Sequence, residues 1–313
     1  MTEPAVRPRR HRKTGRREHR AAWSCTGFLM LVLVVAAQPA PAAAPRTLDT
    51  TVLSFNIRYG RADDGPDSWE HRSDLVCATI AARAPAIFGV QECLWEQGEV
   101  LRAAFPGYEF TGYGRDDGER AGEMCAIFTD RERYDVLDRG VFWLSETPDV
   151  VGSRGWDAAL HRIATWVMLR DRACLPDTLF VFNAHFDHVG EVARERSAVV
   201  LRHRIDAIVG SHAVFVMGDF NAAANSPVHA VLTDGKVGLT DAWTCADEGE
   251  RRRGSGTFHG FNGEPVRGRI DWILASPHLP CRDAGIDRSA RAGRYPSDHF
   301  PVWAVYPQNR RTP

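Results

Sequence analysis

The sequence lacks several features that would place it outside the class of single folded domains. It has no Gly/Ser-rich linker and no tandem repeat, which argues against linked domains and against a solenoid. Its apolar run at residues 28–37 is shorter than the about 20 residues that cross a membrane. The cysteine spacings match no zinc knuckle or ribbon. We therefore expect one large domain without a structural zinc site of these types.

An excess of basic charge is also missing. The first 44 positions hold eight of the 39 Lys and Arg residues and two of the 40 Asp and Glu residues. The rest of the chain therefore carries 31 basic and 38 acidic side chains, a formal net charge of about −7. This balance argues against a strongly cationic nucleic-acid surface. A cluster of acidic metal ligands would contribute to the excess.

The first residues are typical of a secretory signal. A basic run at residues 7–20 precedes the apolar run, and an Ala/Pro-rich stretch follows it to residue 45. We predict a signal peptide over residues 1–44, one domain over 45–307 and a C-terminal tail over 308–313. The mature protein is then expected to be secreted, monomeric and not stably inserted in a membrane. An uncleaved N-terminal anchor is the alternative.

The cysteine pairing stays open at the level of sequence. Export permits disulfides, but an expected helix holds Cys77 and an apolar strand holds Cys125, so both could be buried thiols. The cysteines of the expected mature chain are Cys77, Cys93, Cys125, Cys174, Cys245 and Cys281.

Strands outnumber helices in the expected secondary structure. Because the two do not alternate strictly, we predict an α/β domain with two packed sheets and helices outside them. Loops are expected at residues 108–122, which are Gly-rich, and at 243–256, which are charged. Helices are expected at residues 69–83, 95–104, 190–209 and 225–232. Strands are expected at 51–57, 86–90, 124–129, 136–144, 164–169, 178–183, 213–217, 269–274 and 301–306.

One short motif lies at the end of the apolar run 213–217. Gly218 opens the backbone there, and Asp219 and Asn221 follow at a spacing that puts both side chains on one face of a strand. A carboxylate beside a carboxamide can orient a water molecule and bind an oxyanion. Alone, the motif is more typical of a strand that ends in an Asx turn.

Other polar residues occupy similar positions at the ends of apolar strands, where a rigid scaffold presents chemistry at one rim. Their oxygen-rich composition suits Mg²⁺ or Mn²⁺ and suits Zn²⁺ poorly. A metal, a base for water and donors for developing charge together meet the needs of phosphoester hydrolysis without a covalent protein nucleophile. The set comprises Asn56, Glu92, His185, Asp219, Asn221, Asp271, Asp298 and His299.

Six motifs in this order resemble the endonuclease/exonuclease/phosphatase, or DNase I-like, superfamily, and further segments resemble an exported bacterial branch of it. The resemblance covers residues 48–306 and implies a four-layer α/β sandwich of two packed mixed sheets flanked by helices. The motifs are Ser-Phe-Asn-Ile (54–57), Gln-Glu (91–92), Asn-Ala-His-Phe-Asp (183–187), Gly-Asp-Phe-Asn (218–221), Arg-Ile-Asp-Trp-Ile (269–273) and Ser-Asp-His-Phe-Pro-Val (297–302).

The resemblance also implies a role for each motif residue. Asn56, Glu92 and Asp298 match metal-binding positions, for Mg²⁺ or Mn²⁺. Asp219 matches the carboxylate that activates water. The positions expected to contact phosphate, transfer protons or orient those groups are His185, Asn221, Asp271 and His299.

Several residues near the motifs are candidates for substrate contacts. The expected function is hydrolysis of a small phosphomonoester or phosphodiester by an activated water. A secreted nuclease, a phospholipid head-group hydrolase and a non-catalytic binding protein on the same scaffold are the alternatives. The partner is therefore a small phosphorylated substrate or, in the nuclease alternative, a nucleic acid. The candidate contacts are Arg58, Arg115, Glu123, Asp187, His188 and His259.

Overall fold

The computed structural model describes residues 49–173, 178–234, 238–266 and 268–307. The expected signal peptide, the expected C-terminal tail and Cys174 therefore lie outside the described residues. Within the described ranges, no helix combines the length and the apolar character needed to cross a membrane.

Two six-stranded sheets form the centre of the domain. Their strand orders are β11-β12-β1-β2-β4-β3 and β5-β6-β7-β8-β10-β9. Both sheets are mixed, because β1 pairs with β2 and β7 with β8 in parallel while the other pairs are antiparallel. The first sheet holds β1 (Thr50–Asn56), β2 (Ile87–Cys93), β3 (Tyr108–Thr111), β4 (Met124–Asp130), β11 (Asp283–Ile286) and β12 (Val302–Tyr306). The second holds β5 (Tyr134–Trp143), β6 (Ile163–Asp171), β7 (Thr178–His185), β8 (Ala213–Asp219), β9 (Thr240–Asp241) and β10 (Asp271–Ala275).

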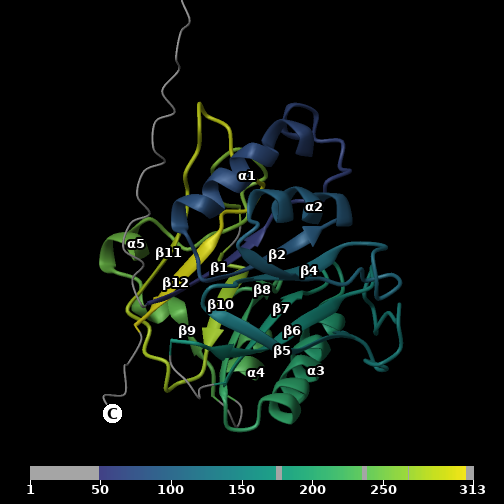
Figure 1. Ribbon diagram of the computed structural model, residues 1–313. Helices are drawn as coiled ribbons and strands as arrows, with labels where there is room; N and C mark the ends of the chain where they lie inside the picture. The colour runs from purple at the N-terminus through teal and green to yellow at the C-terminus, as the bar shows by residue number, and fades with distance from the viewer. Residues whose placement is uncertain (1–48, 174–177, 235–237, 267, 308–313) are drawn as a thin grey trace, which may run out of the picture. The chain divides into compact units, whose positions relative to one another are not determined.

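Helices cover the outer face of each sheet, so the domain has the four layers that the sequence predicts (Figure 1). α1 and α2 share an apolar core with Phe88 of the first sheet. α3 and α4 share a second core with Phe182 of the second sheet. A third apolar cluster fills the space between the sheets. The helices are α1 (Trp69–Arg83), α2 (Trp95–Ala104), α3 (Glu191–Val209), α4 (Pro227–Thr233) and α5 (Glu248–Arg252), with 3₁₀ turns η1 (Gly65–Asp67) and η2 (Ala242–Cys245).

The alternation of side chains along the strands decides which polar residues face the space between the sheets. On β8, the apolar residues two and four positions before Asp219 pack between the sheets, so Asp219 faces the same space. Asn56 on β1 and His185 on β7 face the same space, because the residues four positions before them, Val52 and Val181, pack between the sheets. Deeper in this layer, Gln91 Nε2 donates to Asn183 Oδ1 at 2.7 Å and links the two sheets.

Two loops expected from sequence contain short elements, and two short strands were not expected. The expected loop at 108–122 contains β3, and the expected loop at 243–256 contains η2 and α5. α5 forms because the Asp247 side chain accepts a hydrogen bond from Glu250 N at its start, with acidic residues in its first turn and basic ones in its last. β9 and β11 were not expected, because strands of two and four residues are too short to show a period.

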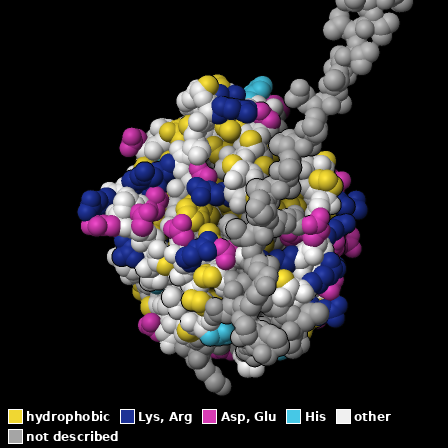
Figure 2. Space-filling view, turned by 60° about the vertical axis from the view of Figure 1, so that its left-hand side comes forward, with side chains coloured by type: hydrophobic (Ala, Val, Ile, Leu, Met, Phe, Trp, Pro, Cys, Tyr) yellow, Lys and Arg dark blue, Asp and Glu magenta, His cyan; other side chains and the backbone are white. Residues whose placement is uncertain are grey.

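Charged side chains of both signs are interspersed over the described part of the face shown in Figure 2. Many of the exposed ones form pairs, such as Arg61 with Glu96 at 2.7 Å. Pairs of this kind contribute little to stability, but they prevent a broad field of one sign. The mixed surface agrees with the charge balance of the sequence.

Candidate active site

Three neighbouring strands of the second sheet bring the catalytic candidates side by side. Asp219 ends β8 and pairs in register with His185, which ends β7, and with Asp271, which begins β10. Because β10 runs antiparallel to β8, its first residue meets the last residue of β8 at one edge of the sheet. All three side chains are buried. Residues of three motifs that lie far apart in the sequence thus form a single cluster.

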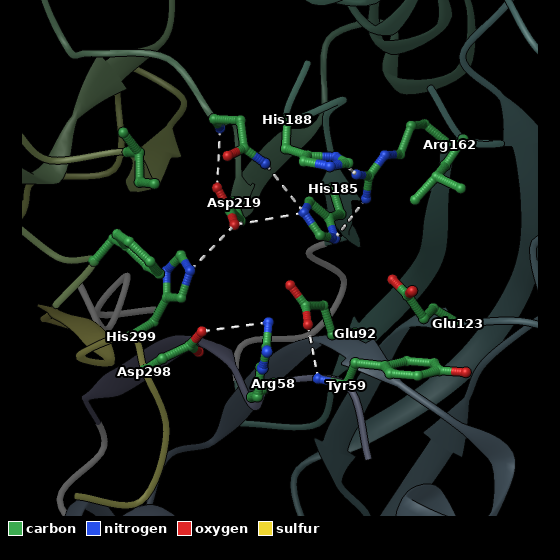
Figure 3. Close-up of a pocket in the computed structure, with 14 residues that line it drawn as sticks. Arg58, Tyr59, Glu92, Glu123, Arg162, His185, His188, Asp219, Asp298 and His299 are labelled. Atoms are coloured by element: carbon green, nitrogen blue, oxygen red, sulfur yellow. Dashed lines mark hydrogen bonds and ion pairs between the residues drawn. The ribbon is translucent and has the colours of Figure 1, made fainter. Parts of the chain in front are cut away.

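Asp219 lies at the centre of this cluster. Its Oδ1 accepts from Asn221 N at 2.9 Å, and its Oδ2 accepts from Asn56 Nδ2 at 3.0 Å. The Nε2 atoms of His185 and His299 lie 3.5 and 3.8 Å from Oδ2 (Figure 3). Burial, and next the carboxylate of Asp271, raise the pKa of Asp219 to about 7. A carboxylate with this pKa can accept a proton from water near neutral pH.

His299 is held by Asp271. Its Nδ1–H donates to Asp271 Oδ2 at 2.9 Å, because a carboxylate only accepts, and Nε2 therefore faces Asp219. Thr257 Oγ1 accepts from the backbone N of Asp271 at 3.3 Å. Burial opposes the charged ring, but the carboxylates of Asp271 and Asp219 outweigh it and raise the pKa of His299 to about 10. His299 is therefore a cationic donor beside Asp219.

Asn56 connects Asp219 with Glu92. Its Nδ2 donates to both carboxylates at 3.0 Å, and its Oδ1 accepts from Arg58 N at 3.0 Å. These three contacts fix the orientation of the amide. Glu92 also accepts from Tyr59 N at 2.7 Å. Asn56 therefore bridges two acidic groups. Unlike Glu92, it does not line the cavity.

Glu92 and Asp298 are the carboxylates best placed for a hard cation. Burial raises the pKa of Asp298, and the charge of Glu92 adds to the effect although His299 opposes it. Arg58 Nη1 lies 3.7 Å from Asp298 Oδ2, while the other end of its guanidinium pairs with Asp64 at 2.8 and 2.9 Å. Two carboxylates that face one cavity fit a divalent ion that prefers oxygen ligands.

A second group of ligand atoms is already occupied by internal contacts. Asp219, Asp271 and His299 offer one atom each within 4.8 Å of one another. The hydrogen bond between His299 and Asp271 uses two of these residues. This group is therefore less available to a metal ion than the carboxylates of Glu92 and Asp298, which line the cavity.

Three site residues have a left-handed backbone. The φ angles are 61° at Arg58, 57° at Glu92 and 47° at Asn221, values that cost energy for residues with a Cβ. Glu92 also lies where the register of β2 with β4 shifts between Val90 and Cys93. A shift of this kind re-aims a side chain. The local fold therefore directs these residues toward the site at the expense of stability.

His185 depends on Arg162, which the sequence did not single out. Arg162 Nη1 lies 3.0 Å from His185 Nδ1, and because arginine has no acceptor, Nδ1 must accept. The ring proton then lies on Nε2, which faces Asp219 at 3.5 Å, so the 3.2 Å contact of Nε2 with Asn221 Nδ2 is not a hydrogen bond in this tautomer. Burial, and next Arg162, lower the pKa of His185 well below its usual value. His185 is thus a neutral donor.

Arg72 and Gln97 position the loops around the site and were also not expected. Arg72 is 1% exposed and donates to the carbonyl oxygens of Asp67, Ile57, Pro296 and Arg58, so it joins the loop after β1 to the loop before His299. Gln97 Oε1 accepts from Gly60 N at 3.0 Å, and its Nε2 donates to Arg58 O at 3.0 Å. Only their burial in the folded domain reveals these roles.

The site opens into a cavity of about 390 Å³. Three candidates for substrate contacts lie on its wall, namely Arg58, Glu123 and His188. Three others do not: Arg115 pairs with Glu123, Asp187 is buried beneath Arg162, and His259 is buried against Phe300 with ring centroids 3.9 Å apart. The cavity is lined by Arg58, Tyr59, Glu92, Glu123, Leu160, Arg162, His185, His188, Asp219, Asn221, Phe258, Ile270, Asp298 and His299 (Figure 3).

Residues 53–299 match the sequence model of the endonuclease/exonuclease/phosphatase family. This chain belongs to that family. It is a hydrolase that acts on phosphoester bonds. Enzymes of the endonuclease/exonuclease/phosphatase family generally depend on a divalent metal ion, in keeping with the carboxylates around the cavity. A comparison with curated proteins finds no significant match.

Solved structures of the family share the fold over nearly their whole length. A family member from Bacteroides vulgatus is 37% identical, covers 83% of this chain and 99% of its own, and superposes with a TM-score of 0.77. A mannosyl-6-phosphatase from Bacteroides thetaiotaomicron is 33% identical, covers 82% and 99%, and has a TM-score of 0.74. The catalytic domain of human nocturnin with bound sulfate is 19% identical, covers 82% and 93%, has a TM-score of 0.66 and supports the fold alone.

Proposed function

We propose that this chain is an exported, divalent-metal-dependent phosphatase that hydrolyses small phosphomonoesters such as sugar phosphates. The observation that carries the proposal is the cavity. Its volume of about 390 Å³ falls in the range of about 300–1,000 Å³ that is usual for small-molecule sites. The resemblance to a mannosyl-6-phosphatase that is 33% identical adds support. The formal net charge of about −7 beyond residue 44 also favours a small substrate over a nucleic acid.

Asp219 is the base in the proposed reaction. Its Oδ2 takes a proton from the water whose oxygen attacks phosphorus. The bond from phosphorus to the leaving oxygen breaks with its electron pair on that oxygen, which takes up a proton from solvent in the open cavity. His299 Nε2 and His185 Nε2 both face Asp219 and donate to phosphoryl oxygens. Asn221 Nδ2, held by Phe186 O at 3.1 Å, is a further donor. Donors fixed before the reaction stabilise the charge that develops in the transition state.

Glu92 and Asp298 would hold the metal ion, oriented by the hydrogen bonds from Asn56 and Tyr59 to Glu92. When bound, a divalent ion neutralises charge on the phosphoryl oxygens. The ion would also offset the repulsion between the two carboxylates that contributes to the raised pKa of Asp298. Mg²⁺ and Mn²⁺ suit these oxygen ligands.

A substrate panel with the mature protein and Mg²⁺ tests the substrate class. We expect turnover of hexose 6-phosphates and of an aryl phosphomonoester that exceeds turnover of an aryl phosphodiester, DNA, RNA and sphingomyelin. Faster release of nucleotides from DNA or RNA would favour the nuclease alternative. Faster release of phosphocholine would favour a head-group hydrolase. Absence of turnover across the panel would favour a binding protein.

Variants and chelation test the chemistry. We expect Asp219→Ala to lower kcat by at least about 100-fold, since general acid–base groups contribute about 10²- to 10⁴-fold. We expect losses of at least about 100-fold in Glu92→Ala, which lacks a proposed metal ligand, and in His299→Ala, which lacks a donor to the developing charge. EDTA should inactivate the enzyme, and Mg²⁺ or Mn²⁺ should restore it. Asp149→Asn, at an exposed pair with Arg204, is the matched control and should retain full activity. Activity in all three active-site variants, or indifference to chelation, would contradict the mechanism.

Export rests on the composition of residues 1–44, and the disulfide between Cys245 and Cys281 supports it. Disulfides persist in oxidising compartments and are rare in the cytosol of mesophiles. Expression of the full chain in a bacterium should yield a protein outside the cytoplasm that lacks about its first 44 residues. N-terminal sequencing and fractionation measure this, and a full-length cytoplasmic product would count against export.

A further inference from the structure

Glu123 forms part of the cavity wall, but the proposed hydrolysis does not use it. Its side chain is 12% exposed, and its two oxygens each accept from one Nη of Arg115 at 2.8 Å. A carboxylate has lone pairs beyond these two bonds, so Glu123 can accept further hydrogen bonds. Burial raises its pKa although Arg115 opposes the effect. Holding this group in the wall is costly, which suggests a role in binding.

The loop that carries Glu123 holds it in place. Arg115 N donates to Glu123 O at 3.1 Å, and Asp116 N donates to Ala121 O at 3.0 Å. Trp143 Nε1 donates to Arg115 O at 2.7 Å and ties the loop to β5. Glu123 directly precedes β4 and therefore has little freedom. Its carboxylate is preorganised as an acceptor.

His188 offers the complementary donor on the same cavity. Arg162 Nη2 lies 2.9 Å from His188 Nδ1, so Nδ1 accepts and the ring proton lies on Nε2. Burial, and next Arg162, lower the pKa of His188, which keeps the ring neutral. Arg162 is itself fixed by Asp187 Oδ2 at 3.3 Å. One guanidinium thus sets the tautomer of His188 as well as that of His185.

Glu123 and Arg162 lie on one side of the cavity in Figure 3, while His299 and Asp298 lie on the other. The phosphoryl group belongs with the catalytic groups, so the organic part of the substrate meets the wall with Glu123 and His188. This wall offers a charged acceptor and a neutral donor. A hydroxyl group both donates and accepts, and a site built for hydroxyls discriminates strongly against analogues that lack them.

We propose that Glu123 and His188 bind hydroxyl groups of the substrate and select polyhydroxylated phosphomonoesters over phosphomonoesters with an apolar organic group. The proposal rests on the phosphatase function proposed above. It gives two residues outside the hydrolytic machinery a role in specificity. A loss confined to hydroxylated substrates is its signature, since a merely structural role would affect every substrate alike.

The test compares kcat/KM for a hexose 6-phosphate with kcat/KM for phenyl phosphate, in the Mg²⁺-loaded enzyme. In Glu123→Gln we expect the value for the hexose phosphate to fall about 10- to 100-fold, as for loss of a hydrogen bond to a charged group. The value for phenyl phosphate should stay within about twofold, because that substrate leaves Glu123 unused. Glu119→Gln removes one charge from an exposed position of the same loop and should change neither value.

His188→Ala provides a second, independent variant, since His188 is exposed and Arg162 keeps its contacts with Asp187 and His185. It should also lower kcat/KM for the hexose phosphate selectively, whereas His203→Ala, at an exposed position on α3, should not. Equal losses on both substrates, or no loss in either variant, would overturn the proposal. A wild-type enzyme that hydrolyses neither phosphomonoester would instead contradict the phosphatase function, and the specificity proposal with it.

Discussion

Asp187 determines the position of the cavity wall. Burial alone would raise its pKa, but hydrogen bonds from the backbone and the charge of Arg162 outweigh burial and lower the pKa to about 2. The carboxylate therefore stays ionised and ties together two loops and one guanidinium. Its donors are the backbone N atoms of Ala159, Leu160, Val189 and Gly190 and the side chain of Arg162.

Asp187→Asn should therefore destabilise the protein in a pH-dependent way. The pKa of Asp187 is about 2 when folded and about 3.9 when unfolded, so ionisation stabilises the fold above pH 4. We expect the free energy of unfolding to drop by about 2 kcal/mol at pH 7. The difference from wild type should shrink as pH falls from about 4 towards 2. Urea unfolding at several pH values measures both.

The matched control is Asp149→Asn, which removes an exposed carboxylate that pairs with Arg204. Its effect should stay below about 0.5 kcal/mol, as for most surface changes. A difference between wild type and Asp187→Asn that stays constant from pH 7 to pH 2 would show that shape, and not charge, is what Asp187 contributes.

At the scale of elements, the close approach of β7 and β8 places the catalytic groups. Gly218 has a φ of 152°, and a Cβ at this position would lie 2.0 Å from Ala184 O. The glycine therefore allows the two strands to pair up to their last residues, which brings His185 opposite Asp219. A larger residue would separate the strand ends.

Gly218→Ala should accordingly lower both activity and stability. We expect a loss of about 1–3 kcal/mol in the free energy of unfolding, typical of overpacking, because the clash is with backbone and cannot be relieved by a side-chain rotation. Hydrolysis of an aryl phosphate should fall by more than the unfolded fraction explains. Gly107→Ala, where a Cβ meets nothing within 4 Å, is the control. Equal behaviour of the two variants would refute this role of Gly218.

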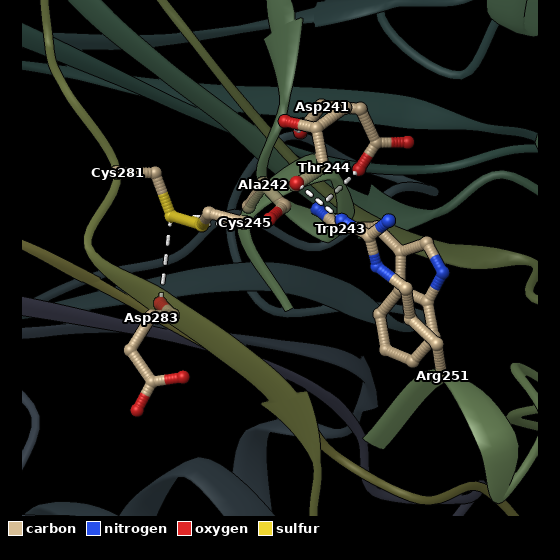
Figure 4. Close-up of a disulfide and its surroundings, with 8 residues drawn as sticks. All are labelled: Asp241, Ala242, Trp243, Thr244, Cys245, Arg251, Cys281 and Asp283. Atoms are coloured by element: carbon tan, nitrogen blue, oxygen red, sulfur yellow. Dashed lines mark hydrogen bonds between the residues drawn. A yellow bond between two sulfur atoms is a disulfide. The ribbon is translucent and has the colours of Figure 1, made fainter. Parts of the chain in front are cut away.

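At the scale of the whole domain, one disulfide connects the edges of the two sheets. Cys245 ends η2, which follows β9 in the second sheet, and Cys281 precedes β11 in the first (Figure 4). Within the described residues, Cys77, Cys93 and Cys125 are free; Cys93 and Cys125 are buried thiols, and Cys77 is half-buried. The disulfide residues do not line the catalytic cavity.

Removal of this disulfide should therefore reduce stability without altering catalysis. The bridge spans 36 residues, for which loop-closure entropy predicts about 3–4 kcal/mol. We expect the double variant Cys245→Ser/Cys281→Ser to unfold at lower urea concentration with an unchanged kcat at 25 °C. Cys77→Ser, which removes a free thiol, serves as the control. A large fall in kcat in the folded double variant would indicate that the sheet edges influence the site.

The residues of the hydrolytic site could be predicted from sequence because their signals are local. An apolar strand followed by a polar residue marks Asn56, His185 and Asp219, since alternation along a strand needs only a few neighbours in sequence. The helices at 69–83 and 95–104 were also predicted, because the signals of a helix are likewise local in sequence. The order of the motifs was enough to indicate the family and the four layers.

The tertiary structure decided what depends on distant neighbours. Arg162 contacts residues that lie 23 to 26 positions away, and only the pairing of β6 with β7 brings them together. The disulfide partners and the carbonyl groups held by Arg72 are likewise set by how the sheets pack. Sequence therefore determined which groups perform the chemistry. Strand register and packing determined the tautomers, the orientations and the walls around them, because these arise from contacts that no local pattern records.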